Sequence, residues 1–158
     1  NDREMLELAL AAREIFHDGW LGVHDRVHVG AASSADGIHL GRHSLCPEEA
    51  RCLVGSDVAL GVSHHLEELK DSTMHADYRF LSPVFQTISK STDGATLGLS
   101  RLRSATMLSR TWALGGMDAQ LLSSVLSCGP AGVAAIGGVF AEGQTGKNME
   151  AMLRAVDS

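Results

Sequence analysis

Two hydroxyls and one ammonium lie close together where a short apolar segment gives way to a polar loop. We predict a buried strand from Tyr78 to Ser82, followed by a loop that carries Thr87, Ser89 and Lys90. Hydroxyl and ammonium donors at this spacing can converge on one anion. The segment therefore predicts a phosphate or diphosphate site at the end of this strand.

A second polar group follows the predicted strand at 58–63, in the segment Gly-Val-Ser-His-His at 61–65. His65 opens a predicted helix that extends to His75. The positive end of a helix lowers the pKa of an imidazole, and a near-neutral pKa is what proton shuttling requires. We predict a functional His65. His39 lies within a predicted strand, and we expect it to be a core histidine with satisfied hydrogen bonds.

Two glycine pairs follow the last two predicted strands, at Gly115–Gly116 and Gly137–Gly138. Glycine lets an anionic oxygen approach backbone N–H groups without an intervening side chain. Either pair alone is also typical of a tight turn. The occurrence of both pairs on consecutive strands favours a phosphate-binding role.

Short apolar strands alternate with helices at intervals of about 20 residues, which indicates a parallel sheet. Helices are expected at 3–17, with Asn1 or Asp2 as its cap, and within 44–55, with Pro47 in its first turn. Further helices are expected at 65–75, 100–109, 119–128 and 145–156. Strands are expected at 20–25, 37–41, 58–63, 77–83, 111–117 and 132–140. The sequence thus predicts one α/β domain over 1–158, either an open doubly wound sheet or an arc of a (β/α)8 barrel.

Composition limits the partners of this domain. A net charge of −6 and seven aromatic residues other than histidine argue against a nucleic-acid surface. No apolar run approaches the length of a membrane helix. Cys46, Cys52 and Cys128 lack metal-site or disulfide spacing, so we expect reduced, buried cysteines in a cytoplasmic protein.

The order of the motifs resembles the thiamine phosphate synthase family, which includes the similar thiazole tautomerases. The resemblance spans about residues 20–140 and rests on six segments: HDR (24–26), ADGIHLG (35–41), GVSHH (61–65), ADYRFLSPVFQTISK (76–90), ALGGM (113–117) and AGVAAIGGVF (131–140). It implies a (β/α)8 barrel of TIM type. It also implies a transferase of thiamine biosynthesis that joins an aminopyrimidine diphosphate to a thiazole phosphate and releases diphosphate.

The resemblance also implies roles for individual residues. Asp25 matches a magnesium ligand, Lys90 holds the diphosphate and contributes to catalysis, and His65 matches the residue that moves a proton in the tautomerases. The remaining positions bind substrate: His24 and Ser63 near the diphosphate, Thr87 and Ser89 near the thiazole, and Gly115, Gly116, Gly137 and Gly138 at the thiazole phosphate.

Three departures from the family pattern bear on these roles. The family usually has Asn-Asp at the position of His24-Asp25, and Gln-Glu-Asp at the position of residues 42–44. Ser44 thus replaces the second magnesium carboxylate, which weakens the predicted Mg²⁺ site, and Arg42 is available to contact the diphosphate directly. Gly137 also replaces a serine. These changes keep two alternatives open: a tautomerase-like isomerase that needs no metal, and a non-catalytic relative that binds phosphate ligands.

The first strand, first helix and second strand of the barrel have no counterpart in these residues, because the helix at 3–17 aligns with the second barrel helix. We expect a fragment of a longer chain. A six-stranded variant, or a dimer that pairs the free strand edges, is the alternative. The expected partners are small-molecule substrates and possible further copies of the chain in a homo-oligomer, without nucleic acid or membrane.

Overall fold

The computed structural model describes residues 1–41, 43–64, 75–87 and 96–156. These residues form two compact units. The first contains the described residues up to Ser63 together with His75–Tyr78, and the second contains His64 and the described residues from Arg79 onward. None of the helices in these ranges has the length and the apolar stretch that a membrane crossing requires.

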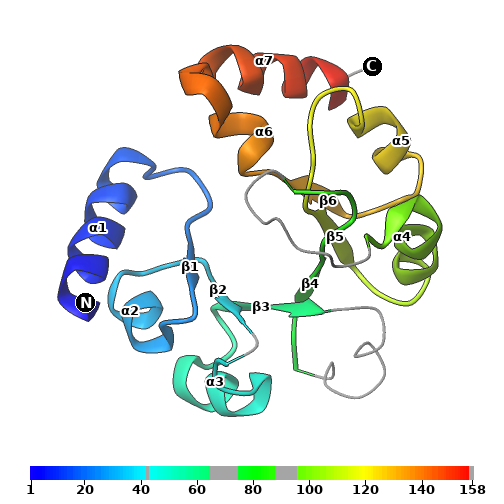
Figure 1. The fold of residues 1–158 in the computed structure, drawn as a ribbon. Coiled ribbons are helices and arrows are strands. Elements are labelled where there is room, and N and C mark those ends of the chain that lie inside the picture. The colour runs from blue at the N-terminus through cyan, green and yellow to red at the C-terminus, as the bar shows by residue number, and fades with distance from the viewer. Residues whose placement is uncertain (42, 65–74, 88–95, 157–158) are drawn as a thin grey trace. The chain divides into compact units, whose positions relative to one another are not determined.

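In the first unit, parallel strands alternate with helices, and strand order follows the chain (Figure 1). The helices cover one face of the strands. The elements are α1 (Asp2–Ile15), β1 (Gly22–His24), α2 (Val27–Ala32), β2 (Gly37–Leu40), α3 (Pro47–Val54) and β3 (Ala59–His64).

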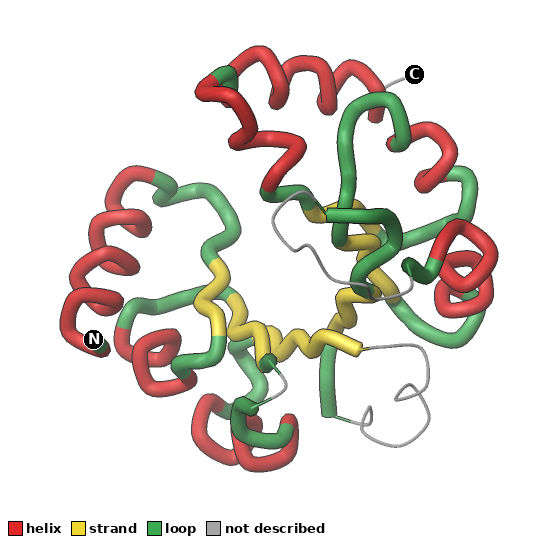
Figure 2. The backbone as a smooth tube through the Cα atoms, in the orientation of Figure 1, coloured by secondary structure: helices red, strands yellow, loops and turns green. Residues whose placement is uncertain are grey.

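The second unit repeats this alternation, with β5 paired in parallel to both β4 and β6. Figure 2 shows how loops join its strands to the helices outside them. The elements are β4 (Tyr78–Leu81), α4 (Gly98–Thr106), β5 (Thr111–Leu114), α5 (Leu122–Leu126), β6 (Gly132–Ala134), α6 (Gly137–Phe140), the 3-10 helix η2 (Ala141–Gly143) and α7 (Thr145–Val156). The predicted α/β class and parallel strands are confirmed.

Capping explains where two helices begin. At α1 the Asn1 side chain accepts a hydrogen bond from the Glu4 N–H at 3.0 Å, and the Glu4 carboxylate accepts one from the Asn1 amine at 3.1 Å. Pro47 occupies the first turn of α3, where its missing N–H costs nothing. Glu49 then accepts a hydrogen bond from the Cys46 N–H at 3.1 Å. Both starts agree with the sequence prediction.

The strands of the first unit have two different faces, because successive residues of a strand point to opposite sides. The face toward the helices is apolar, and Ile38 and Leu60 on it are fully buried. Each such side chain contributes about 2–3 kcal/mol through burial. The opposite face carries polar residues at the carboxyl ends of the strands: His24 on β1, His39 on β2 and Ser63 on β3. The sheet therefore separates the core from the polar residues.

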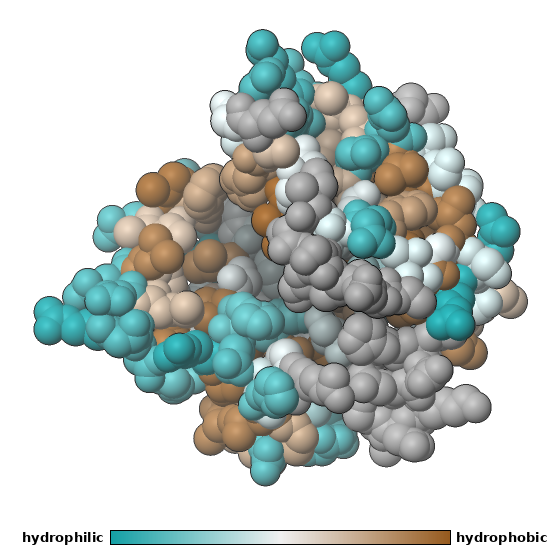
Figure 3. Space-filling view, viewed as in Figure 1, coloured by the Kyte–Doolittle hydropathy of each residue, from teal (hydrophilic) through white to brown (hydrophobic). Residues whose placement is uncertain are grey.

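The apolar residues of α1 are only partly buried. Ala9 is buried and Leu6 packs against its cluster, but Leu10 is 45% exposed and Phe16 is 62% exposed. Apolar residues also reach the surface elsewhere on the face shown in Figure 3, where brown atoms lie among teal ones. The helix predicted at 3–17 is therefore present, with Leu10 and Phe16 among its exposed apolar side chains.

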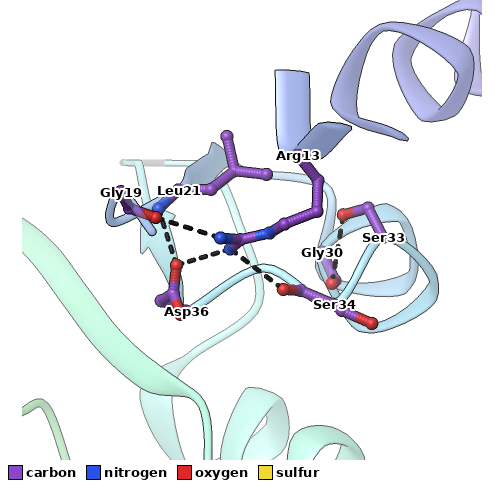
Figure 4. Close-up of polar contacts among 7 residues, drawn as sticks. All are labelled: Arg13, Gly19, Leu21, Gly30, Ser33, Ser34 and Asp36. Atoms are coloured by element: carbon purple, nitrogen blue, oxygen red, sulfur yellow. Dashed lines mark hydrogen bonds and ion pairs between the residues drawn. The ribbon is translucent and has the colours of Figure 1, made fainter. Parts of the chain in front are cut away.

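An arginine joins the end of α1 to the starts of β1 and β2 (Figure 4). The Arg13 guanidinium donates to the carbonyls of Gly19 and Ser34 at 3.0 and 3.1 Å and to Asp36 Oδ2 at 2.5 Å. The same carboxylate oxygen accepts a hydrogen bond from the Leu21 N–H at 2.7 Å. These bonds lower the pKa of Asp36, the Leu21 bond most and the Arg13 bond next.

The same arrangement recurs one strand pair later. Arg51 on α3 donates to the carbonyls of Gly55 and Val58 at 2.7 and 2.8 Å and to Asp77 Oδ2 at 2.5 Å. That oxygen accepts from the Leu60 N–H at 2.7 Å. The residues around both pairs also repeat in sequence, as Ala-Arg, Leu-Gly-Val and Ala-Asp. Two Arg–Asp pairs thus connect helix ends to strand starts within the first unit.

Several sequence predictions are wrong in detail. The predicted strand at 132–140 ends at Ala134, and Gly137 begins a helix. No helix was predicted between β1 and β2, where α2 lies. Cys46 and Cys52 are exposed, so only Cys128 is the buried thiol expected of all three. Residues 65–74 of the helix predicted at 65–75 lie outside the described residues, and His75 lies in a turn.

Candidate functional site

The carboxyl ends of β1, β2 and β3 bring four polar side chains into one neighbourhood in the first unit. The imidazoles of His24 and His39 stack with their centroids 5.6 Å apart. His39 Nε2 lies 2.8 Å from Ser63 Oγ. Asp25 directly follows β1, and both it and Ser63 are exposed. The predicted substrate residues His24 and Ser63 therefore lie on one face, each against His39.

Asp25 has a backbone conformation that non-glycine residues rarely adopt, with φ +68°. The Arg26 N–H bonds to the His24 carbonyl at 2.8 Å, which closes a three-residue γ-turn around Asp25. The Asp25 N–H itself bonds to the His39 carbonyl at 2.8 Å. Strained backbone of this kind costs about 1–3 kcal/mol and is commonest at functional sites.

Ser44 connects the Asp25 carboxylate to the loop after β2. Its hydroxyl donates to Asp25 Oδ1 and accepts from the Gly41 N–H at 2.7 Å. A pocket of about 310 Å³ lies beside this pair, and Arg26, His28 and His43 contribute to its lining. This pocket is an open depression of the surface rather than an enclosed cavity. From the sequence, Ser44 was noted only because it stands where the family has a second magnesium carboxylate. In the structure, its hydroxyl contacts Asp25.

His39 is not the core histidine that the sequence predicted. Its ring is half-buried between those of His24 and Tyr78, the latter at a centroid distance of 5.9 Å. Gly61 makes room for Tyr78, because a Cβ there would lie 2.1 Å from Tyr78 Cζ. Burial, followed by the nearby His24, lowers the pKa of His39 to about 4, while burial and then Asp77 raise the pKa of Tyr78 to about 12. Both side chains are therefore neutral at pH 7.

In the second unit, the first glycine pair packs against the loop after β4. Gly115 and Gly116 have φ values of +98° and +65°. A Cβ on Gly116 would lie 2.4 Å from the carbonyl oxygen of Gln86. Thr87, the next residue of that loop, is half-buried. Conformation and close packing both require glycine here, whatever ligand the loop binds.

The second pair divides into a packed and an open position at the start of α6. A Cβ on Gly138 would lie 2.0 Å from the Met117 carbonyl oxygen, whereas a Cβ on Gly137 would have nothing within 4 Å among the atoms of the described residues. Gly137 is therefore the glycine of this pair with open space around it. It also begins a helix, and the first N–H groups of a helix have no acceptor inside the helix.

This contrast gives a matched pair of variants. We expect Gly138→Ala to destabilise the protein by about 1–3 kcal/mol, because the new methyl overlaps a backbone carbonyl. We expect Gly137→Ala to leave the melting temperature unchanged or slightly raised, because its methyl enters open space in a helix. Thermal unfolding followed by circular dichroism measures both. Equal losses in the two variants would contradict the packing described here.

Some predicted residues lie outside the described ranges. They are His65, Ser89 and Lys90 of the predicted site, and Arg42, the predicted alternative diphosphate contact. Their roles stay predictions. Of the predicted substrate residues that are described, His24 and Ser63 belong to the first unit, and Thr87 and the glycine pairs belong to the second.

Asp25 alone is an incomplete set of magnesium ligands. Within the described ranges, no three His, Cys, Asp or Glu side chains are grouped to hold a metal ion. One Asp25 oxygen accepts from Ser44, although the carboxylate is exposed and faces a pocket. Mg²⁺ prefers oxygen ligands and often combines one or two carboxylates with substrate phosphates and water. The residues fit Mg²⁺ only in that shared form.

Comparison with known proteins points to one family. The family model described as thiamine monophosphate synthase matches residues 1–139. Thiamine-phosphate synthase of Methanoculleus marisnigri is 38% identical over 148 residues, covering 89% of this chain and 70% of that protein. The Agrobacterium fabrum synthase is 33% identical over 151 residues, covering 87% and 68%. The structure of thiamine phosphate pyrophosphorylase from Pyrococcus furiosus matches with a TM-score of 0.88 at 30% identity, covering 99% of this chain and 78% of that one.

Proposed function

Because the chain belongs to the thiamine monophosphate synthase family, we propose that it joins an aminopyrimidine diphosphate to a thiazole phosphate. One observation carries this proposal: the family match over residues 1–139 includes every strand of the described chain and both glycine pairs. The products are thiamine phosphate and diphosphate. The resemblance seen in the sequence motifs and the structural match support the same reaction.

The proposed reaction is a dissociative substitution. The bond between the pyrimidine methylene carbon and the diphosphate oxygen breaks first, and its electron pair leaves with the diphosphate. The lone pair of the thiazole nitrogen then captures the stabilised pyrimidine cation. Catalysis of such a step is mostly electrostatic, because negative charge accumulates on the leaving group. The protein must therefore supply donors and cations to the diphosphate.

We assign the diphosphate to the polar face of the first unit. Ser63 offers a hydroxyl, and His24 lies beside it across His39. Lys90, the ammonium predicted from the sequence, lies outside the described residues. Asp25 would hold Mg²⁺ together with diphosphate oxygens, and a bound Mg²⁺ supplies positive charge to the leaving group. The strained turn at Asp25 and the adjoining pocket support this assignment.

We assign the thiazole phosphate to the glycine pairs of the second unit. The open space at Gly137 supports backbone contact with a phosphate oxygen. Thr87 is the residue after Gln86, whose carbonyl oxygen packs against Gly116. Ser89 is predicted on the same loop. If this assignment is correct, Gly137→Ala raises the KM for the thiazole phosphate although its fold is intact. The variant thus separates a ligand effect from a packing effect.

A second candidate is the thiazole tautomerase reaction, in which His65 would move a proton on the thiazole ring. The single carboxylate at Asp25 favours it, since an isomerase of this kind needs no metal. His65→Ala should then abolish isomerisation while thiazole-phosphate binding survives. Retained isomerisation in that variant would count against the assignment of His65.

The test of the main proposal supplies the purified full-length protein with both substrates and Mg²⁺. Chromatographic detection of thiamine phosphate is the expected result. No product from either the coupling or the isomerisation would leave the non-catalytic, phosphate-binding relative as the remaining function. We also propose the (β/α)8 barrel type for the fold. The missing first elements, the cytoplasmic location and a homo-oligomer stay predictions.

A further inference from the structure

His39 contacts Ser63 in a way that determines which atom of the serine faces a ligand. His39 pairs with Gly61 in the parallel register of β2 and β3, and Ser63 lies two residues further on the same face. The contact joins His39 Nε2 and Ser63 Oγ at 2.8 Å. The serine is exposed, whereas the imidazole is half-buried. The pair thus has one end in the protein and one end toward the proposed substrate.

The imidazole has little freedom to turn away from this contact. The His24 ring stacks on one side at 5.6 Å with an interplanar angle of 20°, and the Tyr78 ring lies at 5.9 Å. Tyr78 occupies the space where a side chain at position 61 would be. Rotamers held by neighbouring rings in this way are typical of a preorganised site.

The contact of 2.8 Å joins two groups that can each donate or accept a hydrogen bond. A neutral imidazole has one nitrogen that donates and one that accepts. Nε2 therefore either donates to Ser63 Oγ or accepts the serine proton. If it accepts, the serine presents only lone pairs to a ligand, and these repel an anionic oxygen. If it donates, the serine proton stays available for the ligand.

We propose that His39 is a positioning residue whose Nε2–H donates to Ser63 Oγ and thereby keeps the serine proton for a diphosphate oxygen. The inference rests on the proposed function, because it takes the ligand of Ser63 to be an anion. It assigns His39 one tautomer, with the proton on Nε2 and the lone pair on Nδ1. Ser63 Oγ then accepts a hydrogen bond from His39 and donates its own proton to the ligand.

Nitrogen-15 NMR of the histidines in the ligand-free protein at pH 7 tests the tautomer directly. Protonated and unprotonated imidazole nitrogens resonate at clearly separate frequencies, and His39→Gln identifies the His39 signals. We expect a protonated Nε2 and an unprotonated Nδ1. The reverse pattern would overturn the proposal. This measurement needs no activity, so it is independent of whether the proposed function is correct.

Variants then test the action through Ser63. The amide of Gln can replace the Nε2–H donor, whereas Leu cannot, so the dissociation constant for inorganic diphosphate should rise less than threefold in His39→Gln and about tenfold or more in His39→Leu. In a Ser63→Ala background, His39→Leu should add less than about twofold. A full additional loss in that background would show that His39 acts independently of Ser63. Diphosphate that fails to bind the wild-type protein would instead contradict the proposed function.

Discussion

Asp25→Gly is expected to lower kcat/KM for thiamine phosphate formation by about 100-fold or more, without lowering the melting temperature. The activity loss follows because the proposed diphosphate site loses its metal-binding carboxylate, and electrostatic groups of this kind contribute about 10²–10³-fold. The stability is kept because glycine adopts a φ of +68° without strain. Ser44 keeps its bond to the Gly41 N–H, and its hydroxyl proton, which loses the Asp25 acceptor, lies at an open depression that water can enter.

Asp25→Asn is the matched control for charge. Asparagine has nearly the shape of aspartate and also tolerates positive φ, but it binds Mg²⁺ weakly. We expect a similar activity loss and an unchanged melting temperature. If Asp25→Asn kept its activity within about twofold, the carboxylate would have no role in the reaction. If Asp25→Gly melted several degrees lower, the turn at Asp25 would not be strained.

Asp36→Ala is expected to destabilise the protein by about 2 kcal/mol, which corresponds to a melting temperature lower by about 4–8 °C. The change removes the acceptor of the Leu21 N–H and the anionic partner of Arg13, whose side chain is only 23% exposed. A charged group that stays covered without its partner costs more than a surface ion pair gains. Differential scanning calorimetry measures the effect.

Acid should remove this stabilisation. The pKa of Asp36 in the folded protein is below its ordinary value of 3.8, first because of the Leu21 N–H and then because of Arg13. The carboxylate therefore stabilises the fold fully above that value, and its contribution declines as the pH falls through the folded pKa. The stability difference between wild type and Asp36→Asn should shrink below about pH 4.

Asp18 provides the surface control for Asp36. Its side chain is 91% exposed and contacts His17, its neighbour in sequence. We expect Asp18→Ala to change stability by less than about 0.5 kcal/mol. If Asp36→Ala changed the free energy of unfolding as little as Asp18→Ala, the contacts of Arg13 with Asp36 would not stabilise the fold.

The sequence predicted most of the elements because their patterns are local. The capped start of α1 and Pro47 at the start of α3 depend on residues within one turn. The segment 132–140 was misjudged because its residues are apolar throughout, and such a run does not distinguish a strand from a buried helix. The helix α2 was missed because it is only six residues long and has no side-chain cap.

The site was predictable to the extent that each residue follows a strand. His24 was identified at a strand end, whereas Asp25 and Ser63 were assigned through the family resemblance. The structure places His24 and Ser63 on one face. Contacts between distant residues left no local pattern. His39 and Ser63 are 24 positions apart, and Arg13 and Asp36 are 23 apart. The repeated Ala-Arg, Leu-Gly-Val and Ala-Asp segments were the available signal for the second of these contacts.

The most direct test of the central claim is a product balance. Mass spectrometry would follow the full-length protein with aminopyrimidine diphosphate, thiazole phosphate and Mg²⁺, beside Asp25→Asn under the same conditions. The account predicts equal amounts of thiamine phosphate and diphosphate from the wild-type protein, and product formation at least about 100-fold slower in the variant. No thiamine phosphate from the wild-type protein would contradict it.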